Sequence, residues 1–350
     1  MTGRLLISEV QTPALLVDVE VLERNIAEMA AALPGPRLRP HVKAHKCTNL
    51  ARWQAAAGHQ GFTCATIREC EGMVAAGLGQ DLLLANEVLD ARRLGALVAE
   101  GARVTLAVDS PHTVEAAVAG GVREVVIDVN VGLPRCGCDP AGAGKLADLA
   151  SKAGLEVRGV MGYEGHVVGL TDAAERAEKT KTAMELLVVA HADVGGELVS
   201  AGGTGTYACN TWASEIQAGS YALMDTAYGK LGLPFGQALF VLATVVSSTG
   251  GSSTGGSSAG GSGTGEWSVA DAGLKAFGMD HGDPDIEDID GAAVWFCSDE
   301  HTTFSPRRPV GERVRFAPAH IDPTMAYHER AYVCSGEQIL DVWPIDLRGW

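Results

Sequence analysis

Short β-rich runs alternate with helix-like segments from residue 38 to about residue 220, and no other feature constrains the fold of this chain as strongly. Between the runs, apolar residues recur every three or four positions, as in Ala65–Ala76 and Ala173–Ala192. Because parallel strands need helical crossovers, eight alternations in a row predict a TIM-type (β/α)8 barrel, with a doubly wound sheet as the competing architecture. The eight runs are Leu38–Ala44, Gly61–Thr66, Asp81–Asn86, Arg103–Val108, Glu124–Asn130, Val157–Glu164, Leu198–Gly202 and Glu215–Gly219.

After Leu231 the sequence changes to strand-like runs with turn residues between them, which indicates a smaller C-terminal β domain. We therefore predict a barrel over residues 20–230 and a β domain over residues 231–350, to which residues 1–19 contribute a strand. Residues 248–265 are nearly all Gly, Ser and Thr. Such a stretch buries too little apolar area to offset its ordering entropy, so we expect a flexible hairpin loop away from the chemistry. The predicted strands are Ala14–Val19, Ala238–Ser247, Trp267–Asp271, Ala292–Ser298, Arg313–Ala317 and Arg330–Cys334, and the first barrel helix is Glu20–Leu33.

The composition excludes several classes of partner. The chain has 350 residues, 46% of them apolar, and a formal net charge of -16, which argues against nucleic acid or an anionic membrane surface as partner. Its eight cysteines show no framework spacing, so we expect reduced thiols. The N-terminus lacks an export signal, and the longest apolar stretch, Leu231–Val246, is interrupted by Pro234 and too short to span a bilayer. We therefore expect a cytoplasmic protein that acts on a small molecule.

Lys43 is the first candidate for chemistry, because it stands between Val42 and Ala44 at the end of the first β-rich run. A lysine among apolar neighbours loses part of its hydration, so its neutral amine is easier to reach. A neutral amine is the form that condenses with a carbonyl group. An ordinary surface lysine is the alternative for a single residue, and the motifs that accompany Lys43 favour the reactive amine.

Two glycine-containing segments follow the last two predicted barrel strands, Gly202–Thr206 and Gln217–Tyr221. Consecutive glycines let backbone N–H groups approach an anion closely, and the threonine hydroxyls add donors. One glycine-rich turn is weak evidence and is more often only a loop. Two of them, at neighbouring strand ends of a barrel, predict a phosphate site.

Two further motifs carry charged or metal-binding side chains. Arg135 follows a buried strand, where it can supply a fixed cation for a phenolate or a carboxylate. In His320-Ile321-Asp322, alternate residues of an extended segment place an imidazole and a carboxylate on one face. Such a pair suits a divalent cation, although an isolated His-x-Asp is more often a simple hydrogen-bonded pair.

Taken together, these motifs resemble the fold-type III pyridoxal phosphate family, which has the fold of alanine racemase, in its D-threonine aldolase and D-serine dehydratase branch. The combination of the lysine segment with His-x-Asp is specific, and the resemblance covers nearly the whole chain except residues 248–265. The matching segments are Thr12–Asp18, Arg39–Lys46, Asn86-Glu87, Asp128–Gly132 with Arg135, Gly162–His166, Gly202–Thr206, Gln217–Tyr221, Asp271–Ala276 and His320–Asp322.

The resemblance implies a role for each matching residue. Lys43 would hold pyridoxal 5'-phosphate covalently, Arg135 would lie near the phenolic oxygen, and Tyr163 would pack close to the ring. Gln217 falls where the racemases of the family place an arginine at the pyridine nitrogen, and it counts among the cofactor contacts. His166 or a metal-bound water is the candidate base, with a core histidine as the alternative for His166. The phosphate would be held by Gly203, Thr204, Gly219, Ser220 and Tyr221.

The resemblance also distinguishes two branches at the metal site. Dehydratase-like members carry His-x-Cys and aldolase-like members His-x-Asp, and this chain has His320 and Asp322. A carboxylate favours harder cations, so Mn²⁺ is the expected ion, with Zn²⁺ and Mg²⁺ as alternatives. The implied activity is cleavage of D-threonine and related D-β-hydroxy-α-amino acids to glycine and an aldehyde, in a homodimer.

Four alternatives to this activity stay open. The first is a dehydratase of D-serine or D-threo-3-hydroxyaspartate on the same scaffold. An amino-acid racemase is disfavoured, since the sequence offers no second base for the opposite ring face. A non-catalytic cofactor carrier is disfavoured by the second domain with its His-x-Asp. A metal-dependent barrel without pyridoxal phosphate is the last.

Overall fold

The computed structural model describes residues 5–249 and 266–350, and these fold as two compact units. The barrel unit consists of residues 26–221, 231–233 and 346–350, and the antiparallel unit contains the described residues of 1–25, 222–230 and 234–345. The predicted loop 248–265 lies almost entirely outside the described residues. No helix in the described part of the chain is both long and apolar enough to cross a bilayer.

The barrel unit is built on seven parallel strands that pair in the order of the sequence. A doubly wound sheet would reverse its strand order, so the sequential pairing confirms the barrel prediction and excludes the competing architecture. The strand residues 62–64, 82–84 and 104–108 are fully buried, as expected for a parallel sheet covered by helices. The strands are β2 (Phe62–Cys64), β3 (Leu82–Leu84), β4 (Val104–Val108), β5 (Glu124–Asp128), β6 (Glu156–Gly162), β7 (Leu198–Ala201) and β8 (Glu215–Ile216).

The first predicted strand, Leu38–Ala44, differs from the prediction. Leu38 forms a single bridge to Ile216 of β8 and His41 one to Thr63 of β2, so this segment joins the two edges of the sheet. It is not a full strand, because Pro40 has no N–H for a ladder and residues 42–44 turn into a 3₁₀ helix. The turn that carries Lys43 therefore begins where this irregular eighth segment ends.

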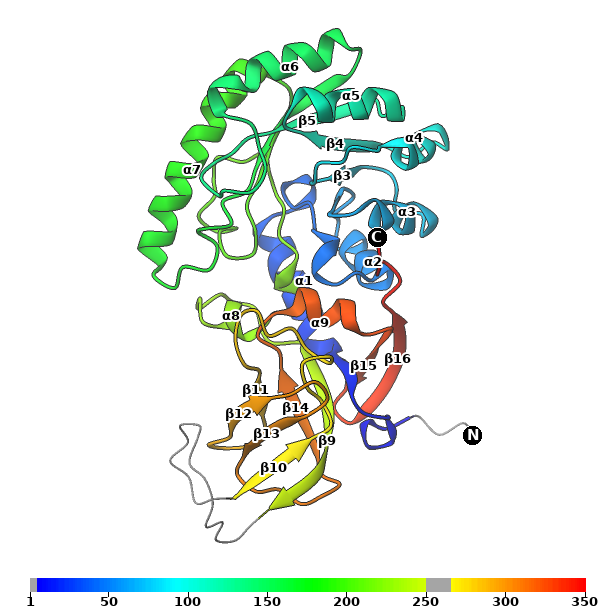
Figure 1. The fold of residues 1–350 in the computed structure, drawn as a ribbon, viewed down its shortest axis with the longest axis vertical. Helices are drawn as coiled ribbons and strands as arrows, with labels where there is room; N and C mark the ends of the chain where they lie inside the picture. Colours follow the sequence, from blue (N-terminus) through cyan, green and yellow to red (C-terminus); the bar gives the residue numbers. More distant parts are fainter. Residues whose placement is uncertain (1–4, 250–265) are drawn as a thin grey trace. The chain divides into compact units, whose positions relative to one another are not determined.

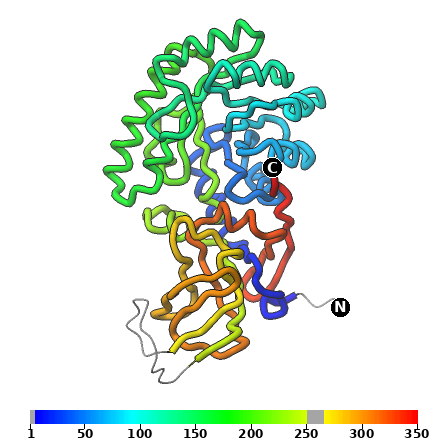
Figure 2. The backbone as a smooth tube through the Cα atoms, in the orientation of Figure 1, coloured from blue at the N-terminus to red at the C-terminus, as the bar shows by residue number. Residues whose placement is uncertain are grey.

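Helices follow the strands around the outside of the barrel unit, in the order of the sequence (Figures 1 and 2). Several begin with a side-chain cap: Thr66 and Glu69 form a capping box on α3, and Asp172 caps α7. The helices of the chain are α1 (Val19–Ala32), α2 (Thr48–Ala56), α3 (Ile67–Ala75), α4 (Arg92–Ala99), α5 (Pro111–Gly120), α6 (Ala143–Lys152), α7 (Ala173–Val194), α8 (Thr226–Gly229) and α9 (Ile321–Tyr327).

The end of the chain returns to the barrel unit and docks beside α2 (Figure 2). The Asp346 carboxylate accepts hydrogen bonds from the Thr48 N–H at 2.9 Å and the Thr48 hydroxyl at 2.6 Å. The Leu347 N–H donates to the carbonyl of Lys46 at 3.0 Å. Asp346 thus supplies the side-chain cap that Cys47, at the start of α2, does not provide.

A buried ionic network lies near the amino ends of the barrel strands. Asp81 accepts from Arg39 at 2.7 Å and from Arg158 at 2.9 Å, and each arginine side chain is only 4% exposed. Arg39 also donates to Glu215 at 2.8 Å, and Arg158 to Glu197 at 2.9 Å. Burial alone would raise the pKa of Asp81, but the two guanidinium groups outweigh it and hold that pKa below its ordinary value.

The antiparallel unit contains a nine-stranded sheet in which β1 lies between β9 and β15. β1 pairs antiparallel with β9 and parallel with β15, so this early segment lies among the C-terminal strands. β9 and β10 pair antiparallel on either side of residues 250–265. The strands are β1 (Ala14–Asp18), β9 (Leu239–Thr249), β10 (Trp267–Ala270), β11 (Asp285–Glu287), β12 (Ala293–Cys297), β13 (Thr302–Ser305), β14 (Arg313–Ala317), β15 (Arg330–Ser335) and β16 (Gln338–Pro344).

Candidate functional site

The turn of residues 42–44 places Lys43 directly after the segment that joins β8 to β2. Lys43 is half-buried, and its neighbours Val42 and Ala44 are fully buried, as the apolar setting predicted. The second lysine of the motif has another partner, because Lys46 Nζ forms an ion pair with the buried carboxylate of Glu69. Lys46 is therefore engaged in an ion pair within the barrel unit.

The two predicted phosphate loops lie side by side. The Tyr221 N–H donates to the Thr204 hydroxyl at 3.0 Å, and the Tyr221 ring is fully buried with its hydroxyl 3.0 Å from Gln54 Nε2. Gly219 packs against the lysine turn, because a β-carbon at this position would lie 2.4 Å from the His41 carbonyl oxygen. Only glycine permits that approach, so Gly219 brings the second loop against the turn that carries Lys43.

Several backbone donors of these loops fit an anion. Within residues 5–249 and 266–350, the N–H groups of Thr204, Gly205, Gly219 and Ser220 donate to no protein acceptor, and all four residues are buried. Buried N–H groups without a partner are rare, because each one costs free energy comparable to a lost hydrogen bond. Four of them in two adjoining loops fit the phosphate oxygens of a bound cofactor.

Glu164 holds the first loop in place, and sequence reasoning missed it. Its buried carboxylate accepts from the Gly202 N–H at 3.2 Å, from the Thr206 hydroxyl at 2.7 Å and from Asn210 Nδ2 at 3.3 Å. A carboxylate with three donors is fully satisfied, so burial does not leave it unpaired. The signal available in the sequence was its place directly after Tyr163.

Arg135 and Tyr163, which were predicted to lie near the cofactor ring, contact each other. The guanidinium carbon of Arg135 is 5.3 Å from the centre of the Tyr163 ring, which is within cation–π range. The other edge of that ring faces the first loop, because a β-carbon on Gly203 would lie 3.6 Å from Tyr163 Cε2. The structure therefore brings Arg135, Tyr163 and the loop of Gly203 and Thr204 together.

His166 lies in the turn after β6 and is exposed, so it is not a core histidine. Its imidazole rests on Gly132, where a β-carbon would lie 3.0 Å from His166 Cε1. Gly132 belongs to the segment that leads to Arg135, which places the candidate base near the candidate cation. The role of His166 as a base remains a prediction.

Gln217 is held by a hydrogen-bond chain into the buried network. Its Nε2 donates to the Ser200 hydroxyl at 2.9 Å, and that hydroxyl donates to Glu215 Oε1 at 2.7 Å. Because the Glu215 carboxylate can only accept, the Ser200 hydroxyl must donate to it and accept from Gln217. The amide NH₂ of Gln217 therefore faces Ser200, and its carbonyl oxygen points away. Gln217 therefore offers an acceptor, where the arginine of the racemases offers a donor.

A carboxyl pair, Asp128 and Glu87, stands next to Arg135 and was also missed. Asp128 ends β5 and is 5% exposed. Burial, and then the adjacent carboxyl of Glu87 with which it forms a hydrogen bond, raise the pKa of Asp128 well above its ordinary value.

In the antiparallel unit, His320 and Asp322 lie close together, but not on an extended segment as predicted. His320 is the extended residue before α9, and Asp322 lies in the first turn of that helix, which the sequence analysis missed. Pro323 also lies in this first turn, where its missing N–H costs no hydrogen bond. His320 Nε2 is 3.6 Å from Asp322 Oδ2, a separation that suits two ligands of one ion.

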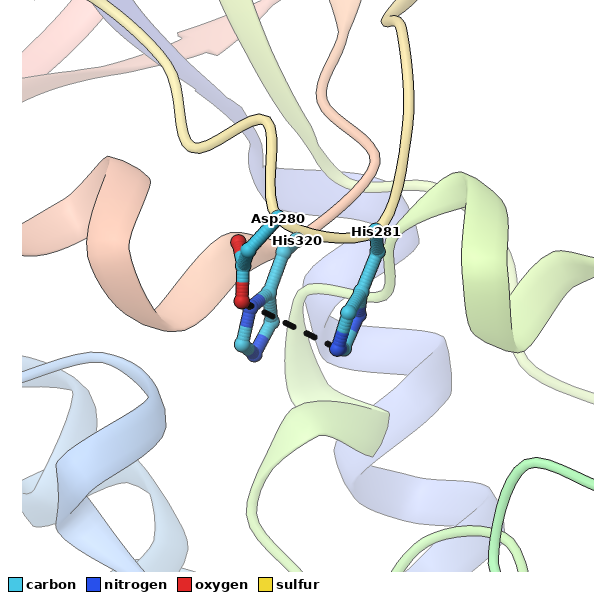
Figure 3. A group of neighbouring side chains, drawn as sticks. All are labelled: Asp280, His281 and His320. Atoms are coloured by element: carbon cyan, nitrogen blue, oxygen red, sulfur yellow. Dashed lines mark hydrogen bonds and ion pairs between the residues drawn. The ribbon is translucent and has the colours of Figure 1, made fainter.

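Two further side chains, Asp280 and His281, lie beside His320 (Figure 3). His320 Nδ1 is 2.8 Å from Asp280 Oδ2. The rings of His281 and His320 stack with centroids 3.9 Å apart and planes 14° apart. Sequence reasoning missed both residues, although the Asp-His pair follows Gly278 and Met279 in a segment otherwise poor in histidine. The ligand atoms of Asp280, His281 and His320 all lie within 4.8 Å of one another, and such nitrogen and oxygen ligands fit a divalent cation.

The comparisons with known proteins agree with both halves of this arrangement. Residues 17–227 match the family model described as alanine racemase, N-terminal domain, and residues 238–334 match the one described as putative serine dehydratase domain. A D-threonine aldolase of Arthrobacter sp. is 32% identical, over 98% of this chain and 94% of that protein.

Solved structures extend the likeness to the fold. D-threonine aldolase from Filomicrobium marinum has a TM-score of 0.88 at 32% identity, over 100% of this chain and 98% of that one. D-threo-3-hydroxyaspartate dehydratase from Delftia sp. HT23 has a TM-score of 0.86 at 25% identity, over 99% of this chain and 100% of that one. A variant of the latter enzyme is described as metal-free. This chain belongs to the fold-type III pyridoxal phosphate enzymes, in the branch that contains the D-threonine aldolases and D-serine dehydratases.

Proposed function

We propose that this lyase cleaves D-threonine and related D-β-hydroxy-α-amino acids to glycine and an aldehyde, with pyridoxal 5'-phosphate and a divalent cation. The observation that carries the proposal is the pair of His320 Nε2 and Asp322 Oδ2, 3.6 Å apart, in a chain that also has the Lys43 turn and two loops of unpaired donors. The carboxylate of Asp322 stands where dehydratase-like members of the family carry a thiolate. A carboxylate favours a hard cation such as Mn²⁺, and the aldolase-like members share it.

The residues of the barrel unit support a cofactor role. Lys43 would hold the cofactor through its amine, and the four unpaired N–H groups would hold its phosphate. Bound pyridoxal phosphate supplies an electron sink for the carbanion that forms when the bond between Cα and Cβ breaks. Arg135, fixed over Tyr163, would pair with the phenolic oxygen or the substrate carboxylate.

The proton of the β-hydroxyl needs an acceptor for this bond to break. A cation held by His320 and Asp322 supplies Lewis acidity, which lowers the pKa of a bound hydroxyl. His166 is the proposed acceptor of the proton, at its imidazole nitrogen. Its exposure lets it pass the proton on to solvent.

Product analysis separates the aldolase from a dehydratase, which the likeness to the Delftia enzyme makes the second candidate. With D-threonine we expect glycine and acetaldehyde, whereas a dehydratase releases a 2-oxo acid and ammonia. D-Serine and D-threo-3-hydroxyaspartate should be tested in parallel, with L-threonine as the control for stereochemistry. A 2-oxo acid as the main product from every D-substrate would replace the aldolase by the dehydratase.

Removal of the metal tests the second half of the proposal. After dialysis against a chelator, we expect cleavage of D-threonine to fall by at least about two orders of magnitude, the scale of one lost electrostatic contribution to catalysis. Mn²⁺ should restore it, and Zn²⁺ or Mg²⁺ should do so less well. Undiminished activity in the chelated enzyme would mean that the ion has no chemical role.

We also propose that the enzyme is a cytoplasmic homodimer. The support for the location is the set of eight cysteines, all of them free thiols, which suit a reducing compartment. The support for the dimer is the resemblance to the family alone. Sedimentation of the purified protein measures the oligomeric state directly.

A further inference from the structure

We infer that Asp280 is the positioning residue of the cation site, and that it fixes His320 in the tautomer that presents Nε2 to the ion. The inference rests on the proposed metal role of His320 and Asp322. The two ring nitrogens of His320 have different carboxylate neighbours. Nδ1 is 2.8 Å from Asp280 Oδ2, and Nε2 is 3.6 Å from Asp322 Oδ2.

The two distances correspond to two kinds of contact. A separation of 2.8 Å between nitrogen and a carboxylate oxygen is that of a charge-assisted hydrogen bond, in which Nδ1–H donates to Asp280. The 3.6 Å on the other side is too long for a hydrogen bond. It is close to the spacing of two atoms that each lie about 2.1 Å from a shared ion. A ring that carries its proton on Nδ1 keeps a lone pair on Nε2, so Asp280 decides which nitrogen can bind metal.

The backbone fixes Asp280 in this position. Gly278 forms a β-bridge with His320, and the Gly278 N–H donates to the Thr324 hydroxyl at 2.9 Å, which in turn donates to the His320 carbonyl at 2.7 Å. A β-carbon on Gly278 would lie 2.2 Å from Cγ of Pro323, so this close approach requires glycine. Ordinary exposed ion pairs contribute little to stability, because holding two mobile side chains in one geometry costs conformational entropy. Here the bridge between Gly278 and His320 joins the two backbone segments only two residues from Asp280, so the side chains are held in place.

His281 stacks against one face of the His320 ring, and we assign it no ligand role. The two ring centroids are 3.9 Å apart. His320 and Asp322 are 21% and 16% exposed, whereas Asp280 and His281 are 57% and 46% exposed. The more buried pair, His320 and Asp322, is therefore the one that would hold the ion, and Asp280 orients His320 (Figure 3 draws Asp280, His281 and His320).

Mn²⁺ binding to the full-length protein, measured by electron paramagnetic resonance of the unbound ion, tests this arrangement. We expect His320→Ala to abolish binding at the site and Asp280→Ala to weaken it by about 10- to 100-fold, the usual effect of losing the partner of a ligating histidine. Asp280→Asn should recover part of the loss, because its amide oxygen still accepts from Nδ1–H. Asp283→Ala, which removes an exposed charge from the same segment, should bind as the unaltered protein does.

Nitrogen-15 spectra of the His320 ring give a second readout that does not depend on metal or activity. The unaltered protein without metal should show the proton on Nδ1, and Asp280→Ala should shift it towards Nε2. A merely structural role for Asp280 would leave the tautomer unchanged.

The outcomes separate the inference from the proposed function. Mn²⁺ affinity that is the same in His320→Ala and the unaltered protein would overturn the metal centre and the inference with it. Affinity lost in His320→Ala but kept in Asp280→Ala would overturn only the positioning role. If His281→Ala weakened binding as much as Asp280→Ala, and Asp322→Ala had no effect, the ion would lie on the Nδ1 side and the inference would be wrong.

Discussion

Replacement of Lys43 by alanine is expected to abolish cleavage of D-β-hydroxy-α-amino acids, with a loss of roughly three orders of magnitude or more, as for other covalent catalytic groups. The physical reason is that the amine both attaches the cofactor and gives way to the substrate amine. The purified variant should also lose the visible absorption of the covalently bound cofactor. The phosphate loops do not involve residue 43, so the variant should still bind pyridoxal phosphate weakly and reversibly.

Chemical labelling supplies the control for that variant. Borohydride reduction of the unaltered enzyme, followed by peptide mapping, should attach the pyridoxyl group to Lys43 and not to Lys46, which is paired with the buried Glu69. Fragmentation of the labelled peptide distinguishes the two lysines. A label on Lys46, or full activity in Lys43→Ala, would contradict the proposed role.

The largest effect on stability is expected from Arg158→Met. This change removes a cation that is 4% exposed and leaves Asp81 and the Thr105 hydroxyl each without one of its partners. Breaking a buried ion pair from one side costs about 3–5 kcal/mol, because the remaining charge stays desolvated. Denaturation by urea at pH 7.5 measures the change in the free energy of unfolding.

Arg103→Met is the matched control, because Arg103 also pairs with a carboxylate, at 2.8 Å from Glu124, but is 43% exposed. Its loss should cost at most about 1 kcal/mol. If both variants lost the same small amount, the buried network would not stabilise the barrel unit.

The loss of unfolding free energy in Arg158→Met should also depend on pH. The pKa of Asp81 in the folded protein lies below its ordinary value, so the stability it contributes is present above that value and is lost as the pH falls through the folded pKa. The variant has lost part of that contribution. The difference in unfolding free energy between the unaltered protein and Arg158→Met should therefore be full at pH 7.5 and should shrink below about pH 4.

Much of the fold followed from local pattern, because periodicity and chain order determine a barrel of sequential parallel strands. The central strands β4 and β5 and the outer helix α7 were predicted to within a few residues. The first segment was wrong in detail, since Pro40 and the 3₁₀ turn at Val42 depend on closing the barrel and not on apolar content. Helix α9 was missed because its seven residues are too few to establish a period.

The candidate site was predictable where the family motif is contiguous, and not where partners come from distant segments. Thr204 and Tyr221 belong to recognised motifs, and the structure joins them. Glu164 contacts residues 38 to 46 positions away, Glu87 contacts one 41 positions away and Asp280 one 40 positions away. No local pattern marks these three residues. Such partners become visible only when the chain is folded.

The docking of residues 346–350 beside α2 has a consequence for synthesis. Because Asp346 caps the helix that follows the Lys43 turn, the barrel unit cannot reach its final form while the last residues are still inside the ribosome. Every residue of the antiparallel unit is therefore synthesised before this cap on the barrel unit can form.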